Sequence, residues 1–223
     1  MSGTKILFLE DDKLYQETIK DLLEEESFIV DTCSNGQEFL NKIFNTIYDL
    51  YILDLNVPQI DGFEIMNILR EYQDETMRLV LSSIPDSTKR SFRSGCDGFL
   101  NKNTHIEELL LRVRTLIKRS YRTYHDFIPI SNSYTYDIFN KRIYHNSTAL
   151  EIESQALFIL DYLIKKRGQF VSKVDLEKNV YPSNSESKSA VIRYHIWSIR
   201  KIIGFDLIES QKNRGYRLKP KGI

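Results

Sequence analysis

Short apolar runs alternate with amphipathic stretches along the first half of the chain. The apolar runs are bounded by polar residues and predict buried strands at residues 5–9, 28–33, 49–53, 78–81 and 98–100. Apolar residues recur at helical spacing within residues 14–23, 37–44, 63–72, 87–94 and 106–119. Strand and helix alternate five times, which predicts a parallel sheet covered by helices on both faces.

The second half has a different pattern. Residues 127–152 predict several short strands broken by turn residues. Helices are predicted over residues 153–167, from a Ser172 cap to Val180, and over residues 187–203, followed by two short strands within residues 207–218. No Gly/Ser or Pro tract separates the halves, so we predict domains at residues 1–120 and 127–223 with a short linker at 121–126.

The formal net charge of zero conceals an asymmetry between the halves. Residues 1–120 carry 14 Lys and Arg against 21 Asp and Glu, whereas residues 121–223 carry 17 against 10. An acidic half joined to a basic half favours separate regulatory and anion-binding tasks, although two unrelated neighbouring domains could also differ in this way.

Composition also limits where the protein works. No stretch approaches the roughly 20 apolar residues that span a membrane, and the N-terminus is not a signal peptide. Cys33 and Cys96 have no zinc-binding spacing and are interpreted as reduced, partly buried thiols. We therefore expect a cytoplasmic protein with no membrane partner.

Polar residues that can carry chemistry follow the predicted strands directly. Glu10 and Asp11 follow the first strand, Asp54 and Asn56 the third, Ser82 the fourth and Lys102 the fifth. The carboxyl ends of parallel strands share one edge of a sheet, so we expect these residues to lie together. Singly, each is an ordinary turn, cap or surface residue, but their agreement indicates a functional site.

The chemistry of this set favours phosphoryl transfer. Carboxylate oxygens suit Mg2+, which would neutralise the oxygens of an incoming phosphoryl group while a carboxylate attacks phosphorus. A hydroxyl at Ser82 and an ammonium at Lys102 would then hold the phosphoryl oxygens.

These residues resemble the response-regulator receiver pattern over residues 4–119, together with Val57-Pro58 and Asp61-Gly62. The resemblance implies that Asp54 is the phosphoacceptor and that a histidine kinase supplies the phosphoryl group. It implies Mg2+ ligands at Glu10, Asp11, Asp54 and the Asn56 carbonyl. It also assigns Ser82 as the switch hydroxyl, Lys102 as the phosphate-pairing lysine and Phe99 as the switch aromatic, for which a plain core role is the alternative.

The sequence departs from the receiver pattern at its output surface. Asn103 replaces the usual proline after the lysine, and the segment from Ser82 to Gly95 is shorter than usual, which predicts a short or remodelled fourth helix. The paired acids before the switch aromatic appear only as Asp97. By resemblance, the homodimer interface would contain Asp97, Glu108, Arg112 and Arg119.

The predicted helix at residues 187–203 has an apolar face and a basic, aromatic face. The apolar face contains Ile192, Ile196, Ile199 and Ile203. The opposite face contains Arg193, Tyr194, Trp197 and Lys201, flanked by Ser198 and Arg200. Such a face suits a helix in the DNA major groove; a solvated charged face is the alternative, against which an exposed Trp197 argues. Lys212 and Arg214 at the hairpin tip would contact phosphates or the minor groove.

A small sheet, three helices and a closing hairpin resemble the OmpR/PhoB-type winged helix over residues 127–219. The resemblance is carried by His195-Ile196, Arg200-Lys201 and Arg214-Gly215-Tyr216-Arg217. It implies DNA contacts at His195, to a phosphate, and at Tyr216 and Arg217. Trp197 and Ser198 stand where many members carry arginines, so only the docking mode is transferred, not the target sequence.

The sequence thus predicts an α/β protein: a five-stranded, parallel, doubly wound (flavodoxin-like) receiver domain with a C-terminal winged helix-turn-helix domain. We expect a phosphorylation-controlled, sequence-specific transcription regulator that binds double-stranded DNA as a homodimer, with RNA polymerase as a candidate partner. We expect no enzymatic turnover beyond slow autodephosphorylation.

Three alternatives remain open. The strand-end acids would suit a phosphotransferase or phosphatase, although no second acid/base group is evident. The receiver could serve as a dimerisation domain without phosphorylation, which Asn103 and the short fourth helix leave open. RNA binding is disfavoured because no aromatic strand platform is present.

Overall fold

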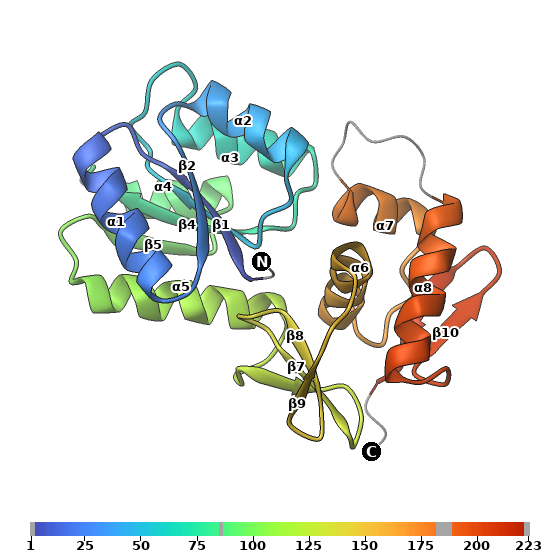
Figure 1. Ribbon diagram of the computed structural model, residues 1–223. Coiled ribbons are helices and arrows are strands. Elements are labelled where there is room, and N and C mark those ends of the chain that lie inside the picture. Colours follow the sequence, from blue (N-terminus) through green and yellow to red (C-terminus); the bar gives the residue numbers. More distant parts are fainter. Residues whose placement is uncertain (1–2, 85–86, 182–188, 221–223) are drawn as a thin grey trace. The chain divides into compact units, whose positions relative to one another are not determined.

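The five apolar runs of the first half form one parallel sheet in the order β2-β1-β3-β4-β5 (Figure 1). The strands are β1 (Lys5–Leu9), β2 (Ile29–Cys33), β3 (Leu50–Leu53), β4 (Met77–Ser82) and β5 (Gly98–Asn101). The computed structural model describes residues 3–84, 87–181 and 189–220. After β2 the chain returns to the other side of β1 to form β3, so the topological switch point lies between β1 and β3.

Helices cover both faces of this sheet, as predicted. They are α1 (Lys13–Glu25), α2 (Gly36–Asn45), α3 (Gly62–Glu71), α4 (Ser87–Ser94) and α5 (Ile106–Ser120). Leu9 and Leu53 pack in the core cluster that contains Phe39 of α2 and the apolar residues of α3. Leu81 and Leu100 line a pocket with residues of α1 and α5 on the opposite face. Burial on both faces explains the unbroken apolar runs at residues 6–9 of β1 and Leu50–Leu53 of β3. The predicted short fourth helix is confirmed, since α4 has 8 residues.

The two cysteines are free and buried. Burial raises the pKa of the Cys33 thiol, and it raises that of the Cys96 thiol to about 11. Both thiols therefore stay protonated near neutral pH and act as small apolar groups of the core.

The second half forms its own unit, which contains Tyr121–Ile223. Its four-stranded antiparallel sheet consists of β6 (Phe127–Pro129), β7 (Tyr134–Asp137), β8 (Arg142–His145) and β9 (Thr148–Leu150). It continues with α6 (Ser154–Lys165), α7 (Lys173–Val180), α8 (Ser189–Ile203) and the hairpin of β10 (Ile208–Gln211) and β11 (Gly215–Leu218). Ser172 caps α7 and forms a capping box with Asp175, as its position suggested. The predicted start of α8 at residue 187 lies outside the described residues.

The apolar faces predicted for this unit form its core. Ile192, Ile196 and Ile199 of α8 are each no more than 1% exposed, and α8 packs on α6. An antiparallel bridge between Val171 and Tyr216 attaches the hairpin to the segment before α7. Gly215 is required there, because its φ is +96° and a Cβ would lie 2.0 Å from the Val171 carbonyl oxygen.

A buried carboxylate connects three parts of this unit. Asp161 of α6 is 5% exposed and accepts hydrogen bonds from the hydroxyls of Tyr136, at 2.7 Å, and Tyr121. The ammonium groups of Lys165 and Lys141 lie 3.2 and 3.4 Å from its Oδ2. Tyr121, the first residue of the predicted linker, is 5% exposed and therefore belongs to the core of this unit.

We expect Asp161→Ala to lower the free energy of unfolding of this unit by about 3–5 kcal/mol, because it removes the acceptor shared by two hydroxyls and two ammonium groups. Asp161→Asn, which keeps one acceptor oxygen, should lose less. Trp197 is the sole tryptophan of the chain, so its fluorescence during urea unfolding reports on this unit alone. Equal losses for the two variants would contradict the contribution of the hydrogen-bond acceptor and assign the whole effect to the charge.

Candidate functional sites

Three carboxylates meet at the topological switch point. Glu10 follows β1 and is fully buried, Asp54 follows β3 and is 4% exposed, and Asp11 is exposed. Each offers an oxygen within 4.8 Å of the others. The sequence prediction that these acids share one edge of the sheet is therefore confirmed. Three clustered carboxylates, two of them buried, need a cation to offset their repulsion.

Lys102, which follows β5, supplies a cation to the two buried acids. Its Nζ lies 2.8 Å from Asp54 Oδ2 and 2.6 Å from Glu10 Oε2, and it donates a hydrogen bond to Glu10 Oε1 at 2.8 Å. Burial raises the pKa of Glu10 despite this partner. Burial would lower the pKa of Lys102, but the hydrogen bonds to Asp54 and Glu10 outweigh it, and the pKa is raised. The ammonium is thus held charged beside Asp54.

The donor set fits a hard divalent cation as well as an ammonium. Glu10 Oε2 is buried and lies 2.6 Å from Lys102 Nζ, so it already faces a cation. Asp11 is exposed beside it and offers further oxygens to solvent. All-oxygen ligands of this kind, with an open side for water, are those that Mg2+ uses in proteins.

The loop after Asp54 orients its carboxylate. The Asn56 backbone N–H donates to Asp54 Oδ1 at 3.3 Å, while Oδ2 faces Lys102. Gly62 opens α3 directly against this loop, and a Cβ there would lie 2.4 Å from the Asp54 carbonyl oxygen. Asp61 caps α3 by accepting from the Glu64 N–H at 2.8 Å. Asp61 and Gly62 therefore set the path of the backbone around Asp54.

Ser82 and Phe99 occupy the positions that the sequence predicted. Ser82 ends β4, is fully buried and accepts a hydrogen bond from the Ile84 N–H at 3.3 Å, so its hydroxyl proton can be donated elsewhere. Phe99 of β5 is half-buried against the core cluster of the α2 and α3 face. Its role as a switch stays a prediction.

The chain forms a turn after Lys102, where Asn103 stands in place of the usual proline. Asn101 Oδ1 accepts from the Asn103 N–H at 2.9 Å, and the Asn101 carbonyl accepts from the Thr104 N–H at 2.9 Å. Tyr15 of α1 donates its hydroxyl to the Lys102 carbonyl at 3.4 Å, and its ring centroid lies 5.1 Å from Lys102 Nζ. Sequence reasoning missed Tyr15 and Asn101. The Asn-Lys-Asn run was a turn signal for Asn101, but only the fold brings Tyr15 to Lys102.

Three of the four residues predicted for a dimer interface lie on α5, and Asp97 directly precedes β5. Glu108 and Arg112 form an exposed ion pair within α5, at 3.6 Å, and Arg119 is exposed. Asp97 is half-buried and accepts from the Arg78 backbone N–H at 3.0 Å, which fixes the chain before β5. Their contacts with a second copy stay a prediction.

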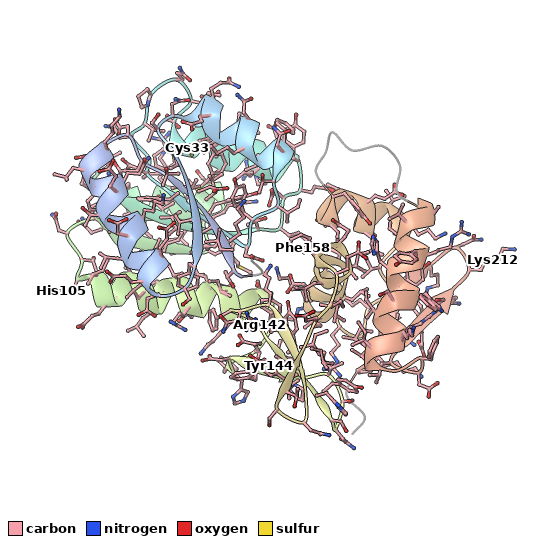
Figure 2. All side chains as sticks on the ribbon, in the orientation of Figure 1. Cys33, His105, Arg142, Tyr144, Phe158 and Lys212 are labelled. Atoms are coloured by element: carbon pink, nitrogen blue, oxygen red, sulfur yellow. The ribbon has the colours of Figure 1, made fainter. Side chains whose placement is uncertain are left out.

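Six of the eleven residues predicted to contact DNA are exposed on α8 and at the tip of the hairpin. They are Arg193, Tyr194, Trp197, Lys201, Lys212 and Arg214. Lys212 extends from the hairpin tip (Figure 2). Arg214 is exposed above the Phe170 ring, 4.3 Å from its centroid. The exposed face of α8 and the hairpin tip together form what we call the basic surface.

The other five residues are engaged within the unit. His195 and Tyr216 are 3% and 6% exposed, so their side chains are not open to a ligand, and the prediction that these two side chains contact DNA is corrected. Ser198 is half-buried. Arg200 donates to the Ile208 carbonyl and to Ser210, and Arg217 pairs with Glu209 across the hairpin. Arg200 and Arg217 thus hold the hairpin against α8 and in register.

Comparison with known proteins identifies both units. Residues 6–114 match the family described as response regulator receiver domain, and residues 147–218 match that described as transcriptional regulatory protein, C terminal. The transcriptional regulatory protein PmrA of Pectobacterium parmentieri is 30% identical over 216 residues, covering 96% of this chain and 97% of PmrA. The response regulator ArlR of Staphylococcus aureus is 28% identical, covering 97% of this chain and all of ArlR. The receiver domain of the Francisella response regulator 1452 superposes with a TM-score of 0.51 at 32% identity, covering 53% of this chain and 99% of that structure.

A receiver joined to this C-terminal domain defines a two-component response regulator with a DNA-binding output. The chain belongs to the OmpR/PhoB-type family of these transcription regulators. None of the helices in the described residues is long and apolar enough to cross a membrane.

We expect Gly62→Ala to lower the free energy of unfolding of the receiver by about 1–3 kcal/mol, because the new methyl group would collide with the Asp54 backbone. Gly3→Ala is the control, since the nearest atom to its methyl group would be the flexible end of Ile29 at 3.3 Å. Urea unfolding followed by circular dichroism measures both, while Trp197 fluorescence follows the other unit. A loss no larger than that of the control would contradict the close packing of Gly62.

Proposed function

We propose that this response regulator accepts a phosphoryl group on Asp54 from a phosphohistidine of a partner kinase. The observation that carries the proposal is the constellation of Asp54, Glu10 and Lys102 at the switch point of the sheet. An Asp54 carboxylate oxygen forms the new bond to phosphorus while the phosphorus–nitrogen bond of the donor breaks and the histidine keeps the electron pair.

Glu10, Asp11, Asp54 and the Asn56 carbonyl would hold Mg2+ beside the acceptor. Bound Mg2+ would offset the charge of the phosphoryl oxygens. Lys102, already 2.8 Å from Asp54, provides a fixed positive charge for the same oxygens, and its raised pKa keeps it protonated at neutral pH. Slow autodephosphorylation is the only hydrolysis we expect.

Phosphorylation would then act on the two residues at β4 and β5. The Ser82 hydroxyl can donate its proton to a phosphoryl oxygen, and the half-buried Phe99 can repack when Ser82 moves. We propose that this change favours pairing of receivers through Asp97, Glu108, Arg112 and Arg119. A homodimer places two basic surfaces on neighbouring half-sites, which raises affinity through effective concentration.

The basic surface supports double-stranded DNA as the ligand of the second unit. An α helix with exposed cations fits the major groove, and the hairpin tip would meet phosphates or the minor groove. Regulation of transcription in the cytoplasm, with RNA polymerase as a further partner, follows from that role.

The phosphoacceptor is tested by intact mass after incubation with acetyl phosphate and Mg2+. We expect a phosphoryl-sized mass gain and a shift toward dimer on size exclusion for the wild type, and neither for Asp54→Asn, which lacks the nucleophilic carboxylate. A chelator should prevent the gain in the wild type. If neither protein gains mass although the wild type binds DNA, the receiver works without phosphorylation, which is the alternative function.

The basic surface is tested by the salt dependence of DNA binding. We expect Arg214→Ala to weaken binding similarly across DNA sequences and to reduce the slope of log K against log salt by about 1, because one phosphate contact is lost. Arg142→Ala, an exposed arginine of β8, is the matched control and should leave the slope unchanged. A loss confined to one base position would show that Arg214 reads a base instead.

A further inference from the structure

Two aromatic side chains stand side by side on the exposed face of α8. Tyr194 is 57% and Trp197 is 50% exposed, and their ring centroids lie 6.4 Å apart at an interplanar angle of 31°. The core beneath them is already filled by Ile192, Ile196 and Ile199. Folding of this unit therefore gives no reason for two large rings in solvent, and an exposed apolar patch of this kind indicates a binding surface.

Two cations of α8 lie next to this aromatic pair, and two more lie at the hairpin tip. Lys201 Nζ lies 5.4 Å from the Trp197 ring centroid, a cation–π contact that restrains the indole. Arg193 is exposed next to Tyr194, and Lys212 and Arg214 are exposed at the hairpin tip. The DNA major groove is bordered by negatively charged phosphates and exposes apolar groups on its base edges. An apolar patch accompanied by positive charge is complementary to such a groove.

The major groove displays one apolar group, the C5 methyl of thymine. Guanine is most often read by a guanidinium that donates two hydrogen bonds. Of the two arginines of α8, Arg193 is exposed in the first half of the helix, whereas Arg200 is held away from such a role, because it donates to the Ile208 carbonyl at 2.7 Å and to Ser210 Oγ at 2.7 Å. The middle of the exposed face of α8 thus offers aromatic rings at Tyr194 and Trp197.

We propose that Trp197, with Tyr194 beside it, reads thymine methyl groups in the major groove, so that this regulator selects thymine at the centre of each half-site. The inference rests on the proposed DNA-binding function and specifies its base preference. Lys201 and Arg193 bind the flanking phosphates and set the depth at which the rings meet the base edges.

The test removes the methyl groups without changing the base pairing. The full-length protein, after incubation with acetyl phosphate and Mg2+, selects duplexes from a randomised double-stranded library, and a selected duplex is remade with deoxyuridine in place of thymine in the half-sites. A second duplex carries deoxyuridine only in the flanks as the control. Fluorescence anisotropy at one salt concentration gives the affinity of wild type, Trp197→Ala, Trp197→Phe and Phe205→Ala for each duplex.

We expect the half-site substitution to weaken wild-type binding about fourfold for each buried methyl group, and the flank substitution to have no effect. Trp197→Ala should bind thymine and deoxyuridine half-sites equally, whereas Trp197→Phe should keep part of the preference. Phe205, 60% exposed beyond the end of α8, is the matched aromatic control, and Phe205→Ala should behave as the wild type. Circular dichroism checks that each variant is folded.

Two outcomes separate failure of the inference from failure of the proposed function. A wild type that selects DNA but binds deoxyuridine half-sites as tightly, or a Trp197→Ala variant that keeps the full preference, overturns thymine reading and leaves DNA binding intact. A wild type that selects no duplex overturns both. Loss of self-association in Trp197→Ala, with unchanged DNA affinity, would instead assign the aromatic pair to contact with a second copy and also overturn the inference.

Discussion

The ion pairs of Lys102 with Glu10 and Asp54 hold the receiver site together. Two carboxylates buried at the ends of β1 and β3 repel each other, and each lost hydration on folding. A unit charge pair at 4 Å is worth about 1 kcal/mol in water but about 4 kcal/mol at the effective permittivity of a protein surface. The two carboxylates therefore attract the Lys102 ammonium strongly at this edge of the sheet. The turn at residues 101–104 and the hydrogen bond from Tyr15 hold Lys102 in place there. At this edge the Asp54 carboxylate is oriented by the Asn56 N–H and lies beside the Lys102 ammonium.

The second unit uses a buried carboxylate for a different purpose. Asp161 is buried, accepts from two tyrosines and pairs with two lysines. It thereby links α6 to the small sheet and to the first residue after the receiver. Arg200 and Arg217 do the same for the hairpin, which leaves the exposed cations of α8 and the hairpin tip for a ligand.

The elements and the acid cluster could be predicted because they depend on local periodicity and on strand ends. The apolar stripe of α8 predicted which of its faces is buried. Because parallel strands end at one edge of a sheet, the sequence also predicted that Glu10, Asp54 and Lys102 lie together. Pairings between distant residues could not be predicted in this way. The contact of Tyr15 with Lys102 joins residues 87 positions apart, and the bonds of Arg200 depend on how closely the hairpin packs on α8. His195 and Tyr216 were assigned by resemblance, and their burial shows that a matching position does not ensure a matching surface.

The place of Tyr121 matters for anyone who divides or recombines this chain. The helix α5 ends at Ser120, and the next residue is already part of the core of the second unit. A fragment that begins at residue 127 would lack Tyr121, which belongs to the hydrogen-bonded group around Asp161. A receiver fragment that ends at residue 126 would carry this tyrosine without the residues of the second unit on which it packs. Chimeric regulators with a foreign receiver should therefore be joined between residues 120 and 121, so that the tyrosine is inherited with the DNA-binding half.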